Sequence, residues 1–424
     1  MRAAAYGDHT DVRVVIALPN LAAGGAQTQG LILARELIQA GIPTGVFLTH
    51  SAEATASNQE LSKGIPVIFS HDVPVRKPLV EIIEHGFLNM TTKAGFHRLS
   101  PLLKGRICRR ILRKFDLPTT VRDSLRTNLK IGLAARSFRT FLEHNEKAIV
   151  ISFLPQTNIA SIIAAVPLTF VAVIERNDFD RQQVGGGIKY AQILLYPRAN
   201  LIGSNSRNAA EQMSAHFPNR DIHFIPNAYQ AALPSSQDSR TEKLMLVVGR
   251  LEKQKRPLEV LRACIDSNSF SQGWKVAFAG SGTLQDELRE MAKSIPNYQD
   301  HVLILGHLKA HEIPYSRVTL SILNSDYEGS PNVLAESLSF GVIPLVRESV
   351  SEFREFIPPE FQHSLVFRDV DSLTNILGNT AGLIARQAEI RERLTHHFNL
   401  RLKEYSMERD RFLQLVTREV SYRD

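Results

Sequence analysis

The sequence predicts an α/β protein made of two doubly wound domains, each built on a parallel sheet. A chain of 424 residues exceeds what one hydrophobic core usually supports. Apolar runs of strand length alternate with segments of helical period, and this alternation restarts after the polar, turn-rich stretch 228–243. We therefore expect an N-terminal domain over 1–230, a linker over 231–243, a C-terminal domain over 244–400 and a last helix over 401–424.

The first half opens with the pattern of a βαβ unit. "VRVVIALPN" is a continuous apolar run typical of a buried strand, "LAAGGAQ" is a glycine loop, and "TQGLILARELIQAGI" has apolar residues at helical spacing. Further apolar runs predict the later strands of this half, at 44–50, 65–71, 148–154, 168–175, 201–206 and 222–227.

The second half repeats the alternation of strand and helix. Strands are expected at 244–250, 275–282, 301–307, 317–325 and 342–348, and helices at 257–267, 283–295 and 332–340. Pro257 fits because proline is tolerated in the first turn of a helix. Ligands of such sheets bind beyond the carboxyl ends of the strands, so two facing sheets would enclose a cleft.

Composition is that of a soluble globular protein, with 43% hydrophobic and 22% charged residues. No unbroken apolar run reaches the roughly 20 residues of a membrane span. The N-terminus lacks the pattern of a secretion signal, and two cysteines in the whole chain fit a reducing, cytoplasmic location. The sequence contains no CxxC pattern, and no metal cluster is expected.

Positive charge is concentrated in one segment, because residues 93–140 contain 13 Lys or Arg and two acids. Within it, 96–115 places six apolar residues on one helical face and arginines on much of the other. Two interpretations remain open: a peripheral helix on an anionic membrane surface, and an ordinary helix packed on the N-terminal core. Aromatic residues are too sparse among the cations to indicate nucleic-acid binding.

The first glycine loop places Gly24 and Gly25 between a strand and a helix. Backbone N–H groups at such a helix start favour an anion. The loop is not GxGxxG, which weakens a dinucleotide interpretation, and a plain tight connection is the alternative.

A second loop, "VVGRLEKQKRP", places Arg250 directly after a strand and Lys255 five residues later. A guanidinium and an ammonium at a strand's carboxyl end are donors suited to a diphosphate. Lys253 and Arg256 are expected to face solvent. The alternative is a charged loop without function.

The third loop lies in "SDYEGSPNVLAESLSFG", residues 325–341. Glu328 falls in the loop, and Asn332 is expected to cap the following helix, with the N–H groups of Asn332 and Val333 facing an anion. Glu336 lies about one turn inside that helix, so both carboxylates can face one site. Carboxylates that bind sugar hydroxyls beside cations that bind phosphate indicate a nucleotide-sugar site.

These motifs resemble the retaining GT-B glycosyltransferases of family 4, also called group 1 glycosyltransferases. "EGSPNVLAES" looks like their "EGxPNxxxEA", "VVGRLEKQKRP" like "GRLxxxK", "AFAGSGTLQDELREMA" like "GxGxxxxxL", and "NLAAGGAQ" like "GGAE". "ISFLPQTNIASIIA" and "VIERND" look like the polysaccharide-forming branch, and "YPRANLIGSNS" like "YRRADxIVxxS". The resemblance implies the GT-B fold, with two Rossmann-like domains facing a cleft.

The resemblance also implies roles for the site residues. Arg250 and Lys255, with Gly249 of the same motif, would bind the diphosphate and stabilise the leaving nucleoside diphosphate. Glu336 would hold the ribose and Glu328 the transferred sugar. The remaining donor-binding positions are Ser330, Pro331, Asn332, Val333, Gly24 and Gly25. The nucleotide is expected to be UDP, and no metal or other cofactor is expected.

One position departs from the family's pattern on the acceptor side. Many members have a histidine after the strand that here reads "AVIERND", where this chain has Arg176 followed by Asn177. Arg176 would bind an acceptor phosphate or the transferred sugar, or pair with Glu175 or Asp178. The sequence "DFD" at 178–180 is an Asp-x-Asp of the sort that holds a metal in the other glycosyltransferase fold, although strand-end loops often contain two aspartates.

We therefore expect an enzyme that moves a sugar from a nucleotide donor to a hydroxyl of a glycan or lipid-linked saccharide, with retention of configuration. The alternatives are an isomerase of GT-B shape such as a UDP-sugar 2-epimerase, and a non-catalytic member that binds nucleotide sugar. The helix over 401–424 would cross back to the N-terminal domain by resemblance, or pack on its own domain.

Overall fold

The computed structural model describes residues 12–22, 24–50, 54–73, 119–182, 184, 187–229 and 242–423. The chain divides into two compact units. The N-terminal unit comprises Met1–Ile225 and Asp410–Asp424, and the C-terminal unit comprises Pro226–Arg409. The chain thus passes between units at 225/226 and again at 409/410.

The N-terminal unit contains a parallel sheet of seven strands in the order β3-β2-β1-β4-β5-β6-β7. Every strand expected from this half of the sequence is present. The strands are β1 Val14–Leu18, β2 Thr44–Leu48, β3 Val67–Phe69, β4 Ile149–Phe153, β5 Phe170–Glu175, β6 Leu201–Ser204 and β7 Ile222–Phe224. The order reverses between β1 and β4, which makes that pair the switch point of the sheet.

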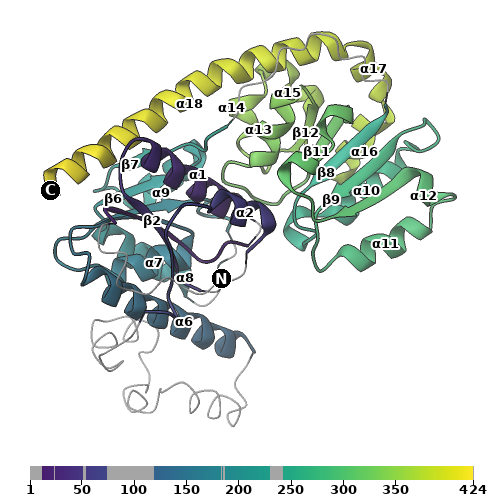
Figure 1. Ribbon diagram of the computed structural model, residues 1–424. Helices are drawn as coiled ribbons and strands as arrows, with labels where there is room; N and C mark the ends of the chain where they lie inside the picture. The colour runs from purple at the N-terminus through teal and green to yellow at the C-terminus, as the bar shows by residue number, and fades with distance from the viewer. Residues whose placement is uncertain are drawn as a thin grey trace. The chain divides into compact units, whose positions relative to one another are not determined.

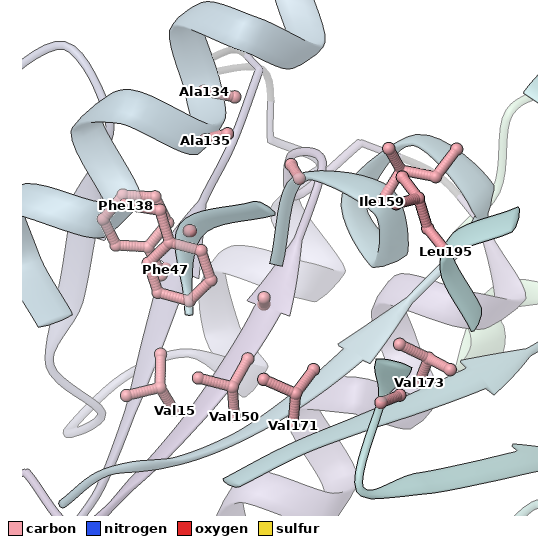
Figure 2. Close-up of a cluster of buried hydrophobic side chains, with 14 of the residues drawn as sticks. Val15, Phe47, Ala134, Ala135, Phe138, Val150, Ile159, Val171, Val173 and Leu195 are labelled. Atoms are coloured by element: carbon pink, nitrogen blue, oxygen red, sulfur yellow. The ribbon is translucent and has the colours of Figure 1, made fainter. Parts of the chain in front are cut away.

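Helices cover both faces of this sheet, because alternate residues of each strand point to opposite faces. On one face, Val15 and Val150 pack with Phe138 and Ile159 of the covering helices, and Phe47 stacks on Phe138 with ring centroids 4.2 Å apart (Figure 2). The helices in contact with this core are α6 Thr119–Leu142, α7 Pro155–Ala164, α8 Ile188–Leu195 and α9 Arg207–His216.

The opposite face carries α1 Gly25–Gln39, whose Leu31, Leu33 and Leu37 are buried against the other set of strand side chains. The remaining short elements of this unit are α2 Ala56–Leu61 and η4 Tyr196–Arg198. Both faces are therefore apolar, as a doubly wound sheet requires.

The C-terminal unit repeats the topology with six parallel strands in the order β10-β9-β8-β11-β12-β13. Its switch point lies between β8 and β11. The strands are β8 Leu244–Val248, β9 Lys275–Ala279, β10 Val302–Gly306, β11 Leu320–Leu323, β12 Ile343–Arg347 and β13 Val366–Phe367. The five expected strands are all present, and β13 was missed because two residues carry no periodic signal.

The helices of this unit begin where the sequence predicts them, to within two residues, at 257, 285 and 332. They are η5 Lys253–Lys255, α10 Pro257–Asp266, α11 Gln285–Lys293, α12 Tyr298–His301, η6 Ala310–Glu312, η7 Tyr315–Arg317, α13 Asn332–Ser339, α14 Phe353–Phe356, α15 Pro359–Leu365, α16 Val370–Gly378 and α17 Thr380–Ala385.

A single long helix, α18 Gln387–Arg423, ends the chain and is the yellow helix of Figure 1. It begins earlier than the helix expected over 401–424. Phe398 and Tyr405 are buried within its C-terminal-unit part, whereas Phe412 and Val416 belong to the core of the N-terminal unit. The helix therefore contributes side chains to both units.

Two expectations concern residues that the structure does not describe. The basic segment 96–115 lies outside the described residues, as does 230–241, most of the expected linker. Among the residues that are described, no helix is both long enough and apolar enough to cross a membrane.

Candidate functional site

The predicted donor residues gather at the switch point of the C-terminal unit. Neighbouring strands β8 and β11 end at Val248 and Leu323, and both are labelled in Figure 1. The loop 249–256 follows β8, and residues 324–331, which we call the donor loop, connect β11 to α13. Parallel strands end at the same edge of a sheet, so this topology brings the two loops together.

Close backbone packing explains the glycines beside this edge. Gly249 donates its N–H to the carbonyl of Ala279 (3.0 Å), and Leu251 donates to the carbonyl of Ser281 (2.9 Å). A Cβ on Gly280 would lie 1.9 Å from the Gly249 carbonyl oxygen, and both glycines have positive φ, 154° and 143°. The "GSG" after β9 is thus required by the loop after β8.

Gln254 joins the loop after β8 to the donor loop. Its carbonyl accepts the N–H of Asp326 (2.9 Å), its Nε2 donates to the carbonyl of Tyr327 (2.7 Å), and its Oε1 accepts from Arg250 (3.2 Å). Arg250 is exposed at the edge of the sheet, as a ligand-binding guanidinium needs to be.

Arg256 corrects one sequence expectation, since it does not simply face solvent. Its guanidinium is ion-paired with both Asp326 and Glu259, and its backbone adopts the left-handed conformation (φ 46°) that turns the chain into α10. The two acids hold a cation that the sequence alone placed in solvent. Lys253, by contrast, is exposed as expected.

A charged network continues under the donor loop and was missed from the sequence. Asn324 donates to the Arg256 carbonyl (3.2 Å), and Arg347 donates to Asn324 Oδ1 (2.9 Å) and to Glu259 (3.0 Å). The sequence signal was faint: a polar residue directly after β11 and an arginine at the end of the neighbouring β12.

Lys255 and Glu328 form an ion pair across the two loops. The side chains are only 17% and 13% exposed, so neither charge is fully hydrated. Removal of one partner would leave a largely buried charge uncompensated, which is costly. The structure thus brings together a predicted phosphate-binding cation and a predicted sugar-binding carboxylate that are 73 positions apart.

The start of α13 corrects the expected cap. Asn332 is the first helical residue, and Pro331 occupies the cap position without a side-chain hydrogen bond. Asn332 Oδ1 instead accepts from Asn227 (2.8 Å). The N–H groups of Asn332 and Val333 belong to the first turn, where intrahelical acceptors are lacking and the helix dipole favours an anion.

Glu336 lies one turn into α13, as expected, and accepts a hydrogen bond from the hydroxyl of Tyr315 (2.7 Å). Burial raises the pKa of the Glu336 carboxyl, and the hydrogen bond from Tyr315 opposes that shift. Tyr315 stacks on Phe340 with centroids 5.2 Å apart. Sequence reasoning missed Tyr315, because no local pattern links it to a helix 17 residues later.

In the N-terminal unit, Gly24 and Gly25 lie at the start of α1, as expected. A Cβ on Gly24 would lie 2.3 Å from Gln27 Oε1, because the Gln27 side chain folds back and donates to Asn20 Oδ1 (3.1 Å). Gln27, which replaces the acid of the resembled motif, therefore hydrogen-bonds across the glycine loop to Asn20.

Arg176 follows β5 and is largely buried, with its guanidinium 5.3 Å from the centre of the Phe153 ring. Its N–H donates to Glu175 Oε1 (3.1 Å), while Tyr196 and Gln192 donate to Glu175 Oε2 (3.0 and 2.8 Å). Burial raises the pKa of Glu175 to about 7. Asn177 is partly exposed at the same edge.

The aspartates of "DFD" have structural partners. Asp178 Oδ1 accepts the N–H groups of Asp180 and Arg181, and Asp180 pairs with His216 (2.8 Å) and Lys189 (3.5 Å). Among the residues that the structure describes, no three His, Cys, Asp or Glu side chains are grouped as metal ligands.

Comparison with known proteins finds glycosyltransferases. A family model described as "Glycosyl transferases group 1" matches residues 230–376. A Campylobacter jejuni protein named GalNAc-alpha-(1->4)-GalNAc-alpha-(1->3)-diNAcBac-PP-undecaprenol alpha-1,4-N-acetyl-D-galactosaminyltransferase is 26% identical over 289 residues, 66% of this chain and 77% of that protein. A second C. jejuni protein, N-acetylgalactosamine-N,N'-diacetylbacillosaminyl-diphospho-undecaprenol 4-alpha-N-acetylgalactosaminyltransferase, is 30% identical over 175 residues, 39% of this chain and 46% of that protein.

Solved structures share the fold along nearly the whole chain. A mutant of S. aureus TarM, crystallised with Fondaparinux, alpha-GlcNAc-glycerol and UDP, aligns with a TM-score of 0.68 at 10% identity, covering 95% of this chain and 99% of TarM. The pneumococcal O-GlcNAc transferase GtfA, in complex with UDP and GlcNAc, aligns at 0.65 and 12% identity, covering 97% and 99%. The chain has the GT-B fold, and its residues 230–376 match the group 1 glycosyltransferase family.

Proposed function

We propose that this glycosyltransferase moves a sugar from a UDP-linked donor to a hydroxyl of a lipid-linked glycan, with retention of anomeric configuration. The observation that carries the proposal is the Lys255–Glu328 ion pair at the β8/β11 switch point, with Arg250 and Glu336 on the adjoining elements. Cations for a diphosphate and carboxylates for hydroxyls stand at one edge of one sheet.

The donor roles follow from the chemistry of each side chain. Arg250 and Lys255 bind the diphosphate, and the first-turn N–H groups of α13 add dipoles aimed at the same anion. Glu336, oriented by Tyr315, accepts hydrogen bonds from the ribose hydroxyls. Glu328 exchanges its pairing with Lys255 for a hydroxyl of the transferred sugar.

Transfer breaks the bond between the anomeric carbon and the β-phosphate oxygen, and the acceptor oxygen bonds to the same face of that carbon. The acceptor proton passes to the leaving phosphate, so the products are UDP and the extended glycan. Lys255 and Arg250 stabilise the negative charge that grows on the leaving group. Neither carboxylate has to act as a nucleophile, unlike those of retaining glycosidases.

The acceptor class rests on the two C. jejuni relatives, whose names specify undecaprenol-diphosphate-linked saccharides. In the N-terminal unit, Arg176 and Asn177 lie after β5 beside the switch point, where they would contact an acceptor phosphate or saccharide. A lipid-linked acceptor also implies that the enzyme works at a membrane surface. Flotation with anionic and neutral vesicles tests that part: recovery with neither kind would contradict it.

Thermal stabilisation by UDP, UDP-GalNAc, UDP-GlcNAc and UDP-glucose tests the donor assignment, because a ligand at 100 times its Kd raises stability by about 2.7 kcal/mol. The donor that stabilises is then incubated with an undecaprenyl-diphosphate-linked saccharide, and UDP release and the anomeric configuration of the product are measured. Absence of stabilisation by every nucleotide sugar, or interconversion of free UDP-sugars without acceptor, would contradict the proposal.

A further inference from the structure

A short segment after β7, residues 226–229, is hydrogen-bonded to the donor loop, although it lies about 100 residues earlier in the chain. The segment begins with Pro226, the first residue of the C-terminal unit. Asn227, which is 3% exposed, donates from Nδ2 to the carbonyl of Ser330 (3.1 Å) and to Asn332 Oδ1 (2.8 Å). One amide nitrogen therefore holds both the end of the donor loop and the first residue of α13.

Tyr229 makes a second connection to the same loop. Its hydroxyl and Ser330 Oγ are 2.8 Å apart. Its ring packs against Phe356 and Tyr405, with centroids 6.0 and 6.4 Å away. Since these ring contacts fix the position of the hydroxyl, Ser330 is held at its side chain by Tyr229 and at its carbonyl by Asn227.

The same segment is also hydrogen-bonded to Arg409, after which the chain leaves the C-terminal unit. Arg409, the last residue of the C-terminal unit along the chain, donates from Nη1 to the carbonyl of Pro226 (3.2 Å). The residues at which the chain enters and leaves this unit are therefore hydrogen-bonded to each other, and the entering segment is hydrogen-bonded to the donor loop.

The donor loop and the start of α13 carry the groups that must point at a bound nucleotide sugar. Residues 324–331 form neither helix nor strand, so their own backbone bonding does not fix where the N–H groups point. Glu328 lies two residues before Ser330, and α13 carries Glu336. A misplacement of such groups by about 1 Å can cost about 100-fold in rate.

We propose that Asn227 and Tyr229 are positioning residues, which hold the donor loop and the start of α13 in the geometry that binds the sugar and phosphates of the nucleotide sugar. This inference rests on the donor function proposed above. Glu336 and the cations have bonds of their own, to Tyr315, Gln254 and Glu328, so binding of the nucleotide alone depends less on the segment.

Tyr229→Phe tests the hydroxyl alone, because phenylalanine keeps the ring contacts with Phe356 and Tyr405. Tyr298→Phe, on α12, is the matched control. We expect Tyr229→Phe to weaken binding of the stabilising UDP-sugar by about 10-fold, binding of UDP by about 2-fold, and to speed amide hydrogen exchange at 328–333 in the free protein. The control should change none of these.

Two substitutions of Asn227 distinguish a positioning role from a packing role, because the two roles predict opposite orders of UDP-sugar affinity. Aspartate keeps the size of asparagine but places an acceptor against the Ser330 carbonyl, which cannot donate in return. We expect UDP-sugar binding to fall by about 10-fold in Asn227→Ala and further in Asn227→Asp, with Asn379→Ala as control. A residue that only filled space would give the opposite order.

Two results separate this inference from the donor function. If the wild-type chain binds none of the four UDP probes, the donor function fails and the inference falls with it. If the wild-type chain binds a UDP-sugar and Tyr229→Phe equals its control in both affinity and hydrogen exchange, the inference alone is overturned. An Asn227→Asp variant with wild-type affinity would overturn it equally.

Discussion

The two sheets share a strand order, yet Glu328 in one unit and Glu175 in the other have different partners at the carboxyl edge. At the C-terminal unit's edge, Lys255 pairs with Glu328 and Arg256 pairs with Asp326 and Glu259. At the N-terminal unit's edge, Tyr196 and Gln192 donate to Glu175 at the end of β5, and burial raises its pKa to about 7. Topology therefore provides a place for chemistry, while burial and the available partners decide how each carboxylate is held.

The largest effect is expected from removing the Lys255–Glu328 ion pair at the edge of the C-terminal sheet. Lys255→Ala removes the ammonium that we propose binds the diphosphate and leaves the Glu328 carboxylate without this partner. We expect kcat/KM for transfer to fall by about 1,000-fold, or about 4 kcal/mol of transition-state stabilisation, measured as UDP release. Lys253→Ala, two residues away and exposed, is the matched control; turnover of Lys255→Ala at the level of that control would contradict the assignment.

The next effect concerns the backbone that supports this edge. Gly280→Ala puts a methyl group 1.9 Å from the Gly249 carbonyl oxygen at a residue with φ 154°. We expect the C-terminal unit to lose about 3 to 4 kcal/mol of unfolding free energy, followed in urea by the fluorescence of Trp274, the single tryptophan of the chain.

Gly273→Ala is the comparison for that variant, because it shares a positive φ (82°) but has no atom within 4 Å of the added carbon. Backbone strain alone should cost it about 1 kcal/mol. Equal losses in the two variants would mean that the contact with Gly249 does not matter.

A pH experiment tests the raised pKa of Glu175 at the edge of the N-terminal sheet. Its raised pKa means that the folded state binds the proton more tightly, so its contribution is present below the unfolded pKa near 4.5 and is lost as pH rises to about 7. In Glu175→Gln this loss is absent. From about pH 5 to about pH 8 the variant should therefore gain about 2 to 3 kcal/mol of unfolding free energy relative to wild type.

Hydrogen exchange of the β4 and β5 amides measures this difference within the N-terminal unit. Glu211→Gln, at an exposed position of α9, should follow wild type at both pH values. A Glu175→Gln curve parallel to wild type across that range would show that Glu175 is ionised at its ordinary pKa.

The smallest of these effects is expected for donor binding. Glu336→Ala removes the carboxylate assigned to the ribose and should weaken UDP binding by about 20-fold, or about 2 kcal/mol, in titration calorimetry. Tyr315→Phe keeps the ring stacked on Phe340 and should weaken it by only a few-fold. Undiminished UDP affinity in Glu336→Ala would place the ribose elsewhere.

Local pattern was sufficient for most of the fold. The buried strands are continuous apolar runs, and Pro257 and the glycine loops mark real starts of helices. The capping residue of α13 was predicted wrongly, because the Asn332 side chain has a partner, Asn227, that no local rule contains. Likewise Arg256 looked like a solvated cation until Asp326 lay beside it.

The sequence by itself determined the two α/β units and the residue types that follow β8 and β11, because periodicity and turn chemistry are local properties of a chain. Tertiary structure decided which of those residues are partners. Lys255 meets Glu328, and Asn227 meets Ser330, only because β8 lies next to β11 and the segment after β7 returns to the donor loop. Such pairings depend on strand order, which sets the neighbours of a charged side chain. They also depend on burial, which sets the free-energy cost of leaving that charge unpaired.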